Sequence, residues 1–77
     1  MITDTRTDLV DQLISAYCDW REHCRDVHAT YERFASAIAP TARRQAFDAY
    51  RTALDSEERA SYVYADQLKL VELAYSR

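Results

Sequence analysis

The sequence contains no glycine, and Pro40 is the only proline among its 77 residues. A glycine-rich loop that cradles phosphate is therefore excluded, and only one strong helix breaker falls inside the chain. Apolar runs are only a few residues long, which excludes a helix that spans a bilayer. The polar N-terminal residues lack the apolar core of a secretory signal, so we expect no export.

A strong charge of one sign is also missing. The formal net charge is −3, and acidic and basic residues alternate along the whole chain. This balance disfavours nucleic acid as a partner. The only local basic cluster comprises Arg43, Arg44 and Arg51, and it keeps a small nucleic-acid-associated factor as an alternative. Lysine occurs once, at Lys69, and this bias together with abundant alanine indicates a GC-rich bacterial or phage genome.

Cysteine is scarce, with only Cys18 and Cys24 present. Both lie in a segment that we interpret as helical, where a spacing of six residues separates the Cα atoms by about 9 Å along the axis. A disulfide requires roughly 7 Å or less, so a bond within the chain is excluded. Free thiols are typical of a reducing compartment, and we expect a cytoplasmic protein.

Apolar and aromatic residues recur at alternating steps of three and four in two arms around Pro40, the a/d pattern of a coiled-coil seam. The first arm contains Val10, Leu13, Tyr17, Trp20, Cys24, Val27, Tyr31, Phe34 and Ile38. The second arm contains Phe47, Tyr50, Leu54, Glu57, Ser61, Tyr64, Leu68, Val71 and Tyr75. The pattern predicts an all-α chain with a single helical domain over 1–77: a helix over about 5–38, a turn at 39–41 and a helix over about 42–75.

The two arms are expected to form a long antiparallel hairpin. Antiparallel partners have a constant sum of residue numbers, and six pairs of similar side chains add up to 81. These pairs are Val10 with Val71, Leu13 with Leu68, Tyr17 with Tyr64, Val27 with Leu54, Tyr31 with Tyr50 and Phe34 with Phe47. The register centres the turn between Pro40 and Thr41, with Thr41 as N-cap or Pro40 in the first turn of the second helix. In the same register Trp20 is expected to face Ser61.

A break in the second arm is an alternative. Asp55 followed by Glu58 resembles a capping box, which would start a third helix and give a compact monomer. The heptad phase nevertheless continues from Leu54 to Ser61. We therefore predict one second helix, continuous or kinked near Asp55.

Each arm carries a second apolar stripe beside the seam, and an apolar arc of this width favours a further helix. Small residues allow close helix approach, so two hairpins are predicted to pair into a four-helix bundle with twofold symmetry. The predicted interaction residues are Ala46, Ala49, Ala53, Ala60, Val63, Leu70, Tyr62, Arg43 and Arg44. The expected partner is a second copy of the chain, and another protein is the alternative.

One group of residues could have a chemical role. Cys24 lies on the seam with His23 and His28 nearby, and the register places Glu57 opposite. Thiolate, imidazole and carboxylate are ligands that zinc accepts. The sequence lacks Cys-x-x-Cys and His-Glu-x-x-His spacing, so we predict no metal and no cofactor. A metal- or redox-responsive bundle that uses these residues remains an alternative.

Catalysis is not expected. A nucleophilic Cys24 with His28 as its base would need a cleft and an oxyanion site, which a narrow helical seam without glycine does not readily provide. No pair of carboxylates is evidently buried for acid and base chemistry. The function predicted from the sequence is therefore a non-enzymatic helical protein–protein interaction module, a homodimeric adaptor or regulator.

Overall fold

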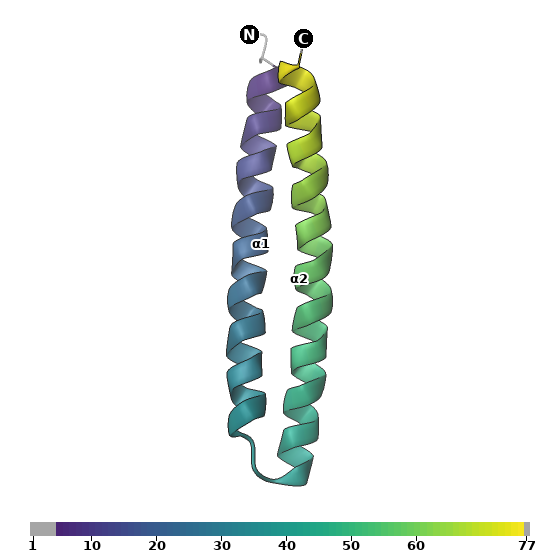
Figure 1. Ribbon diagram of the computed structural model, residues 1–77. Coiled ribbons are helices and arrows are strands. Elements are labelled where there is room, and N and C mark those ends of the chain that lie inside the picture. Colours follow the sequence, from purple (N-terminus) through teal and green to yellow (C-terminus); the bar gives the residue numbers. More distant parts are fainter. Residues whose placement is uncertain (1–4, 77) are drawn as a thin grey trace.

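Two long antiparallel helices make up the fold of the computed structural model, which describes residues 5–76 (Figure 1). Helix α1 spans Thr5–Ser36 and helix α2 spans Pro40–Tyr75. The start of α1 and the end of α2 lie side by side, and the Arg6 guanidinium stands 5.5 Å from the centre of the Tyr75 ring. The all-helical hairpin predicted from the heptad pattern is thus confirmed.

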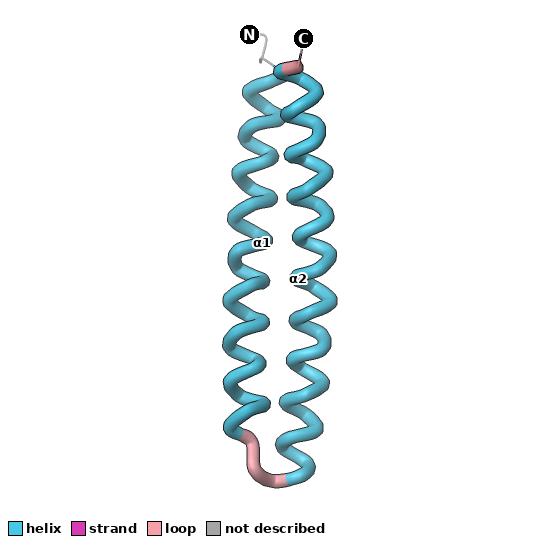
Figure 2. The backbone as a smooth tube through the Cα atoms, in the orientation of Figure 1, coloured by secondary structure: helices cyan, strands magenta, loops and turns pink. Residues whose placement is uncertain are grey.

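Helix α2 is unbroken through residue 55, as Figure 2 shows. The alternative with a third helix starting at Asp55 is therefore wrong. A capping box needs a non-helical residue at its N-cap, whereas the continuous apolar pattern keeps Asp55 inside the helix. The second apolar stripe is consequently not covered by a third helix within the described part of the chain.

The turn has the predicted length of three residues but lies two residues closer to the N-terminus, at 37–39. Helix α1 ends at Ser36, and Pro40 is already the first residue of α2. Ala39 is the N-cap, with φ −68° and ψ 138°, and no side chain caps the helix there. Proline disfavours helical geometry in the residue before it and fits the first helical position, which explains why Ala39 is extended and α2 begins at Pro40. The proposed N-cap role of Thr41 is wrong.

Ring contacts confirm the predicted register. The ring centres are 5.6 Å apart for Tyr17 and Tyr64, 5.6 Å for Tyr31 and Tyr50, and 5.4 Å for Phe34 and Phe47. These three pairs are spread along the whole hairpin, so the helices stay in one register from the turn towards the termini.

The helices are nevertheless rotated relative to the predicted seam. At every second position of the predicted seam, the residue one place earlier in the sequence lies between the helices instead. Ala16 is thus 9% exposed, whereas the predicted seam residue Tyr17 is 45% exposed. On α2, Ala60 is 6% exposed, and Ala53 is half-buried beside the more exposed Leu54. The observed seam contains Leu9, Leu13, Ala16, Trp20, His23, Val27, Thr30, Phe34 and Ala37, and opposite them Ala46, Tyr50, Ala53, Glu57, Ala60, Tyr64, Gln67, Val71 and Ala74. Small residues at alternate positions let the helix axes approach closely, which excludes the larger neighbours from the seam.

This hairpin contains almost no closed core. Among residues 5–76 only Ala16 and Ala60 are buried, and Ile38, predicted to lie on the seam, is 93% exposed in the turn. The Cα atoms extend over 58 × 24 × 12 Å, a ribbon one helix thick. The accessible surface is 6203 Å², whereas surface scaling gives roughly 4,900 Å² for a compact monomer of this mass.

Candidate interaction surface

The ribbon has two broad faces of different chemistry. A local twofold axis normal to the ribbon relates two antiparallel helices, so equivalent heptad positions of α1 and α2 lie on the same face. Residues that directly follow every second seam position, beginning with Val10 after Leu9 and with Phe47 after Ala46, form the face that we call the broad apolar face. Its members are Val10, Tyr17, Cys24 and Tyr31 from α1 and Phe47, Leu54, Ser61, Leu68 and Tyr75 from α2.

Large apolar side chains of this face remain accessible. Tyr31 is 51% exposed and Tyr75 is 55% exposed. Phe47, Leu54 and Leu68 are each between 37% and 40% exposed. Contiguous exposed apolar surface of this extent is typical of an interaction site. The broad apolar face is therefore the candidate functional surface.

A polar contact lies near the middle of the seam. Trp20 donates its indole N–H to Oε1 of Glu57 at 2.7 Å and stacks on Tyr64, with ring centres 5.4 Å apart. The Tyr17 ring completes the cluster, 6.1 Å from the Trp20 ring. Trp20 thus contacts residues on either side of its predicted partner Ser61, whose hydroxyl donates to the Glu58 carbonyl at 2.7 Å. The cluster links both helices near the middle of the hairpin, close to the buried Ala16 and Ala60.

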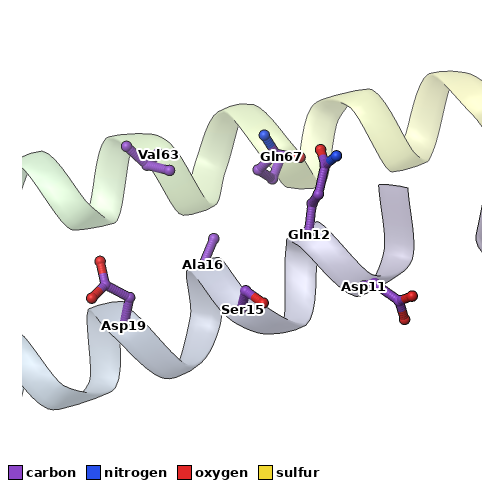
Figure 3. A pocket seen from close by; sticks show the side chains of 7 residues that line it. All are labelled: Asp11, Gln12, Ser15, Ala16, Asp19, Val63 and Gln67. Atoms are coloured by element: carbon purple, nitrogen blue, oxygen red, sulfur yellow. The ribbon is translucent and has the colours of Figure 1, made fainter. Parts of the chain in front are cut away.

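The opposite face of the ribbon carries smaller and more polar side chains. An open groove of about 450 Å³ runs along it near the terminal end, and Figure 3 shows its lining residues. They are Asp11, Gln12, Ser15, Ala16, Asp19, Val63 and Gln67. Oε1 of Gln67 is buried there without a hydrogen-bond partner among the described residues. The groove is shallow and carries no arrangement of reactive groups beyond these carboxylates, amides and hydroxyl.

The alanines predicted for interaction are divided by the structure. Ala60 is buried against α1, and Ala46 and Ala53 are half-buried in the seam, so these three side chains pack inside the hairpin. Ala49 is exposed at a groove on the opposite face, together with Ala46. The small size of Ala46, Ala53 and Ala60 serves the contact between α1 and α2 rather than the surface.

Val63 and Leu70, also predicted for interaction, lie on the opposite face. Val63 is 53% exposed and Leu70 is 44% exposed. The two are therefore accessible, but they are separated from the aromatic residues of the broad apolar face by the thickness of the ribbon.

Tyr62 points outward from α2 and is 61% exposed. Its hydroxyl donates to Oε1 of Glu58 at 3.0 Å. This hydrogen bond to the carboxylate, together with the negative charge of Glu58, raises the pKa of Tyr62 above its usual value. Tyr62 is a surface residue held by its own helix.

The predicted basic cluster is also divided. Arg43 donates to the Ala37 carbonyl at 3.4 Å and lies over the Phe34 ring at 4.7 Å, so it closes the turn. Arg44 is exposed. Arg51 stands 6.0 Å from the centre of the Phe47 ring, at the edge of the broad apolar face. Two of the three arginines thus cover aromatic rings of the hairpin itself.

The candidate metal ligands contact different groups. His23 lies 3.8 Å from Asp19, and His28 lies 3.1 Å from Glu32, both along α1. Glu57 accepts the Trp20 hydrogen bond. Cys18 and Cys24 are free thiols, the first exposed and the second half-buried. No group of three or more His, Cys, Asp or Glu within residues 5–76 is arranged to hold a metal ion.

The broad apolar face itself was not recognised from the sequence. Its tyrosines and leucines were assigned to the interior because they repeat with the same period as the true seam, one residue away. The signal that could have separated the two stripes is side-chain size, since Ala16 precedes Tyr17 and Ala46 precedes Phe47. A two-helix contact accommodates alanine at alternate positions more readily than tyrosine.

Neither described helix contains a stretch both long and apolar enough to cross a membrane. Comparison of the chain with models of protein families, with curated proteins and with solved structures found no match.

Proposed function

We propose that this chain is a non-enzymatic helical protein–protein interaction module that self-associates through its broad apolar face. Two hairpins would pack these faces together into a four-helix bundle. In this role the protein acts as a homodimeric adaptor or regulator, and its free thiols suit a cytoplasmic location. The observation that carries the proposal is an apolar face left uncovered along the hairpin, in which only Ala16 and Ala60 are buried among residues 5–76.

The energetics of folding support a partner. Burial of apolar area is the main term that offsets the conformational entropy lost on folding. In the isolated hairpin none of the described side chains is completely buried. A chain of this size is marginal even when it forms a compact core. Packing a second copy on the broad apolar face would bury the aromatic and leucine side chains that α1 and α2 leave accessible.

The dimensions of the ribbon also suit a dimer. Its broad face measures 58 × 24 Å between Cα extremes. Stable interfaces bury roughly 800 Å² on each partner, and this face offers more than that. The thickness of one helix means that two stacked ribbons have the layer arrangement of a four-helix bundle.

Two leucines on opposite faces give a matched test. Leu68 on the broad apolar face is 38% exposed, and Leu70 on the opposite face is 44% exposed. We expect the wild type to sediment as a dimer at micromolar concentration. Leu68→Asp should shift the equilibrium to monomer because a carboxylate would be buried without a partner, whereas Leu70→Asp should remain dimeric. Circular dichroism checks that both variants stay helical.

Either of two results would count against the proposal. A wild type that sediments at 9.0 kDa at every concentration would exclude self-association. Dissociation by Leu70→Asp but not by Leu68→Asp would move the interface to the opposite face, where Val63 and Leu70 were predicted from the sequence to interact.

A further inference from the structure

We propose that the opposite face of the hairpin binds one helix of a partner protein. That helix is amphipathic, with small or apolar residues towards the groove and arginine or lysine towards α1. Self-association uses the broad apolar face, so this second surface stays free in the proposed dimer. Three features of the opposite face support the assignment: its open hollows, the exposed apolar side chains on its α2 side and the negative charge on its α1 side.

The hollows follow one another along the opposite face. The groove of about 450 Å³ near the terminal end adjoins a second hollow of about 260 Å³, and Asp19 and Val63 line both (Figure 3). A third hollow of about 250 Å³ lies nearer the turn. Each hollow is lined by one small seam residue, in order Ala16, Ala60 and Ala46. A helix fits such a surface, because helices pack by setting ridges of side chains into grooves.

The α2 side of the hollows is small or apolar. Residues at intervals of seven form a line along the helix there, and they are Ala49, Ser56, Val63 and Leu70. Val63 is 53% exposed and Leu70 is 44% exposed. Exposed apolar side chains beside a groove provide the contact that the apolar stripe of an amphipathic helix requires.

The α1 side carries acidic residues. Asp11 and Asp19 line the groove near the terminal end. Glu22 and Asp26 continue the same side towards the turn, because each follows a groove residue, Ser15 or Asp19, by seven positions. We call Asp11, Asp19, Glu22 and Asp26 the acidic edge.

Little within the hairpin neutralises the acidic edge. Asp19 lies 3.8 Å from His23, and its side chain is 63% exposed. Neither Glu22 nor Asp26 forms an ion pair with another described residue. On the α2 side, Arg59 is followed seven residues later by Asp66, so that side has no excess of positive charge. A basic partner would therefore meet carboxylates whose charge is not yet compensated.

The acidic edge also decides between a second copy and a different protein. Two copies joined by this face would bring more carboxylates than guanidinium groups into one interface, and like charges there weaken association. A basic helix compensates the same groups. Asp19 and Asp26 are separated by about 10.5 Å along the helix axis. We therefore expect the partner helix to repeat its cations every seven residues, beside its small or apolar stripe.

The experiment uses two labelled synthetic helical peptides as probes, each about three heptads long. Both carry alanine and leucine at the seam positions of every heptad. One carries arginine beside this stripe, and the other carries glutamate at the same positions. Fluorescence anisotropy with the full-length protein at about 0.15 M salt, where charges are screened beyond about 8 Å, measures both dissociation constants. The basic peptide should bind roughly tenfold more tightly or better.

Reversal of the acidic edge should invert this preference. Asp19→Lys together with Asp26→Lys should weaken binding of the basic peptide by roughly 2- to 30-fold and strengthen binding of the acidic peptide. Asp48→Lys together with Asp55→Lys is the matched control, because these exposed residues have the same spacing but lie on the outer side of α2. The control should bind both peptides as the wild type does. Equal effects of the two double variants would overturn the inference, since they would indicate attraction to the net charge alone.

The apolar side of the groove provides a second readout. Val63→Asn together with Leu70→Asn should weaken binding of the basic peptide roughly tenfold or more, because amide groups would be buried without partners. Leu68→Asn on the broad apolar face should leave peptide binding unchanged, and circular dichroism checks that both variants stay helical. Loss of peptide binding in Leu68→Asn alone would place the peptide on the broad apolar face and overturn the inference.

The outcomes separate this inference from the proposed self-association. A wild type that sediments as a monomer but binds the basic peptide would support the partner site while excluding the homodimer. Binding of neither peptide by a dimeric wild type would overturn the partner site alone. Dissociation of the dimer by the Val63→Asn and Leu70→Asn pair would assign the opposite face to a second copy and also overturn it.

Discussion

Trp20 and Glu57 form the most specific contact between the helices. The indole N–H donates to a carboxylate at 2.7 Å in a half-buried position, and Tyr64 stacks on the ring. Hydrogen bonds to charged groups contribute more than neutral ones, and an unpaired donor left in the seam has a desolvation cost. Because a shift of one helix along the other would break this hydrogen bond, the pair favours one register over neighbouring ones.

Removing the acceptor should therefore destabilise the hairpin. We expect Glu57→Ala to lower the free energy of unfolding by about 1–3 kcal/mol, since the Trp20 N–H loses its partner. Glu57→Gln keeps an acceptor oxygen and should cost less. Urea unfolding followed by the fluorescence of Trp20, the only tryptophan, measures both. Equal losses for the two variants would mean that the hydrogen bond contributes little.

At the scale of single elements, the start of α2 lacks a side chain that caps the helix. Pro40 suits the first helical position, but the N-cap residue is Ala39, whose side chain cannot accept a hydrogen bond from the first turn. Arg43 stabilises the turn in another way, because its guanidinium donates to the Ala37 carbonyl and covers the Phe34 ring. The unsatisfied amide groups at this end are exposed to water.

A capping side chain at this position should stabilise the protein. Ala39 has the extended backbone geometry of an N-cap, so Ala39→Ser and Ala39→Asp should each raise the free energy of unfolding by about 0.5–2 kcal/mol. Thermal unfolding monitored by circular dichroism detects this change. Thr41→Ala serves as the control, because Thr41 lies inside the helix and its loss should change stability little. A destabilised Ala39→Ser variant would contradict the assigned cap.

At the scale of the whole molecule, the hairpin has the shape of half a bundle. A ribbon 12 Å thick cannot enclose large side chains between two helices, so Tyr17, Tyr31 and Phe47 of the broad apolar face remain at the surface, where each contacts a ring of the seam. The proposed second copy would convert this surface into an interior layer. Unfolding of the wild type would then include dissociation of the dimer.

Coupling of this kind makes stability depend on concentration. For a dimer that unfolds to monomers, each tenfold increase in protein concentration adds about 1.4 kcal/mol per dimer, which corresponds to an increase in Tm of about 3–6 °C. Differential scanning calorimetry over a hundredfold concentration range measures this slope. The Leu68→Asp variant should melt at a lower temperature that is independent of concentration. A wild-type Tm that does not change with concentration would argue for a monomer.

The sequence alone determined the two helices, the position of the turn near Pro40 and the register between the arms. Heptad spacing follows from the periodicity of the helix, and proline restricts the backbone dihedral angles of itself and of the residue before it. Both are local properties that can be predicted from the order of the residues. Three aromatic pairs confirmed the register. Of the site, the sequence predicted a second apolar stripe but assigned it to the alanines and to Val63 and Leu70.

Only the tertiary structure decided how each helix is rotated about its own axis. The stripe through Ala16 and the stripe through Tyr17 have the same period and are offset by one residue. Hydrophobicity alone therefore does not decide which of the two stripes faces the other helix. Close packing of two backbones favours the stripe with alanine at alternate positions, because the helices then approach more closely along their whole length. That choice placed Ala60 inside and left Tyr31 and Leu68 on the surface, which is why the candidate interface could be located only once the helices were seen together.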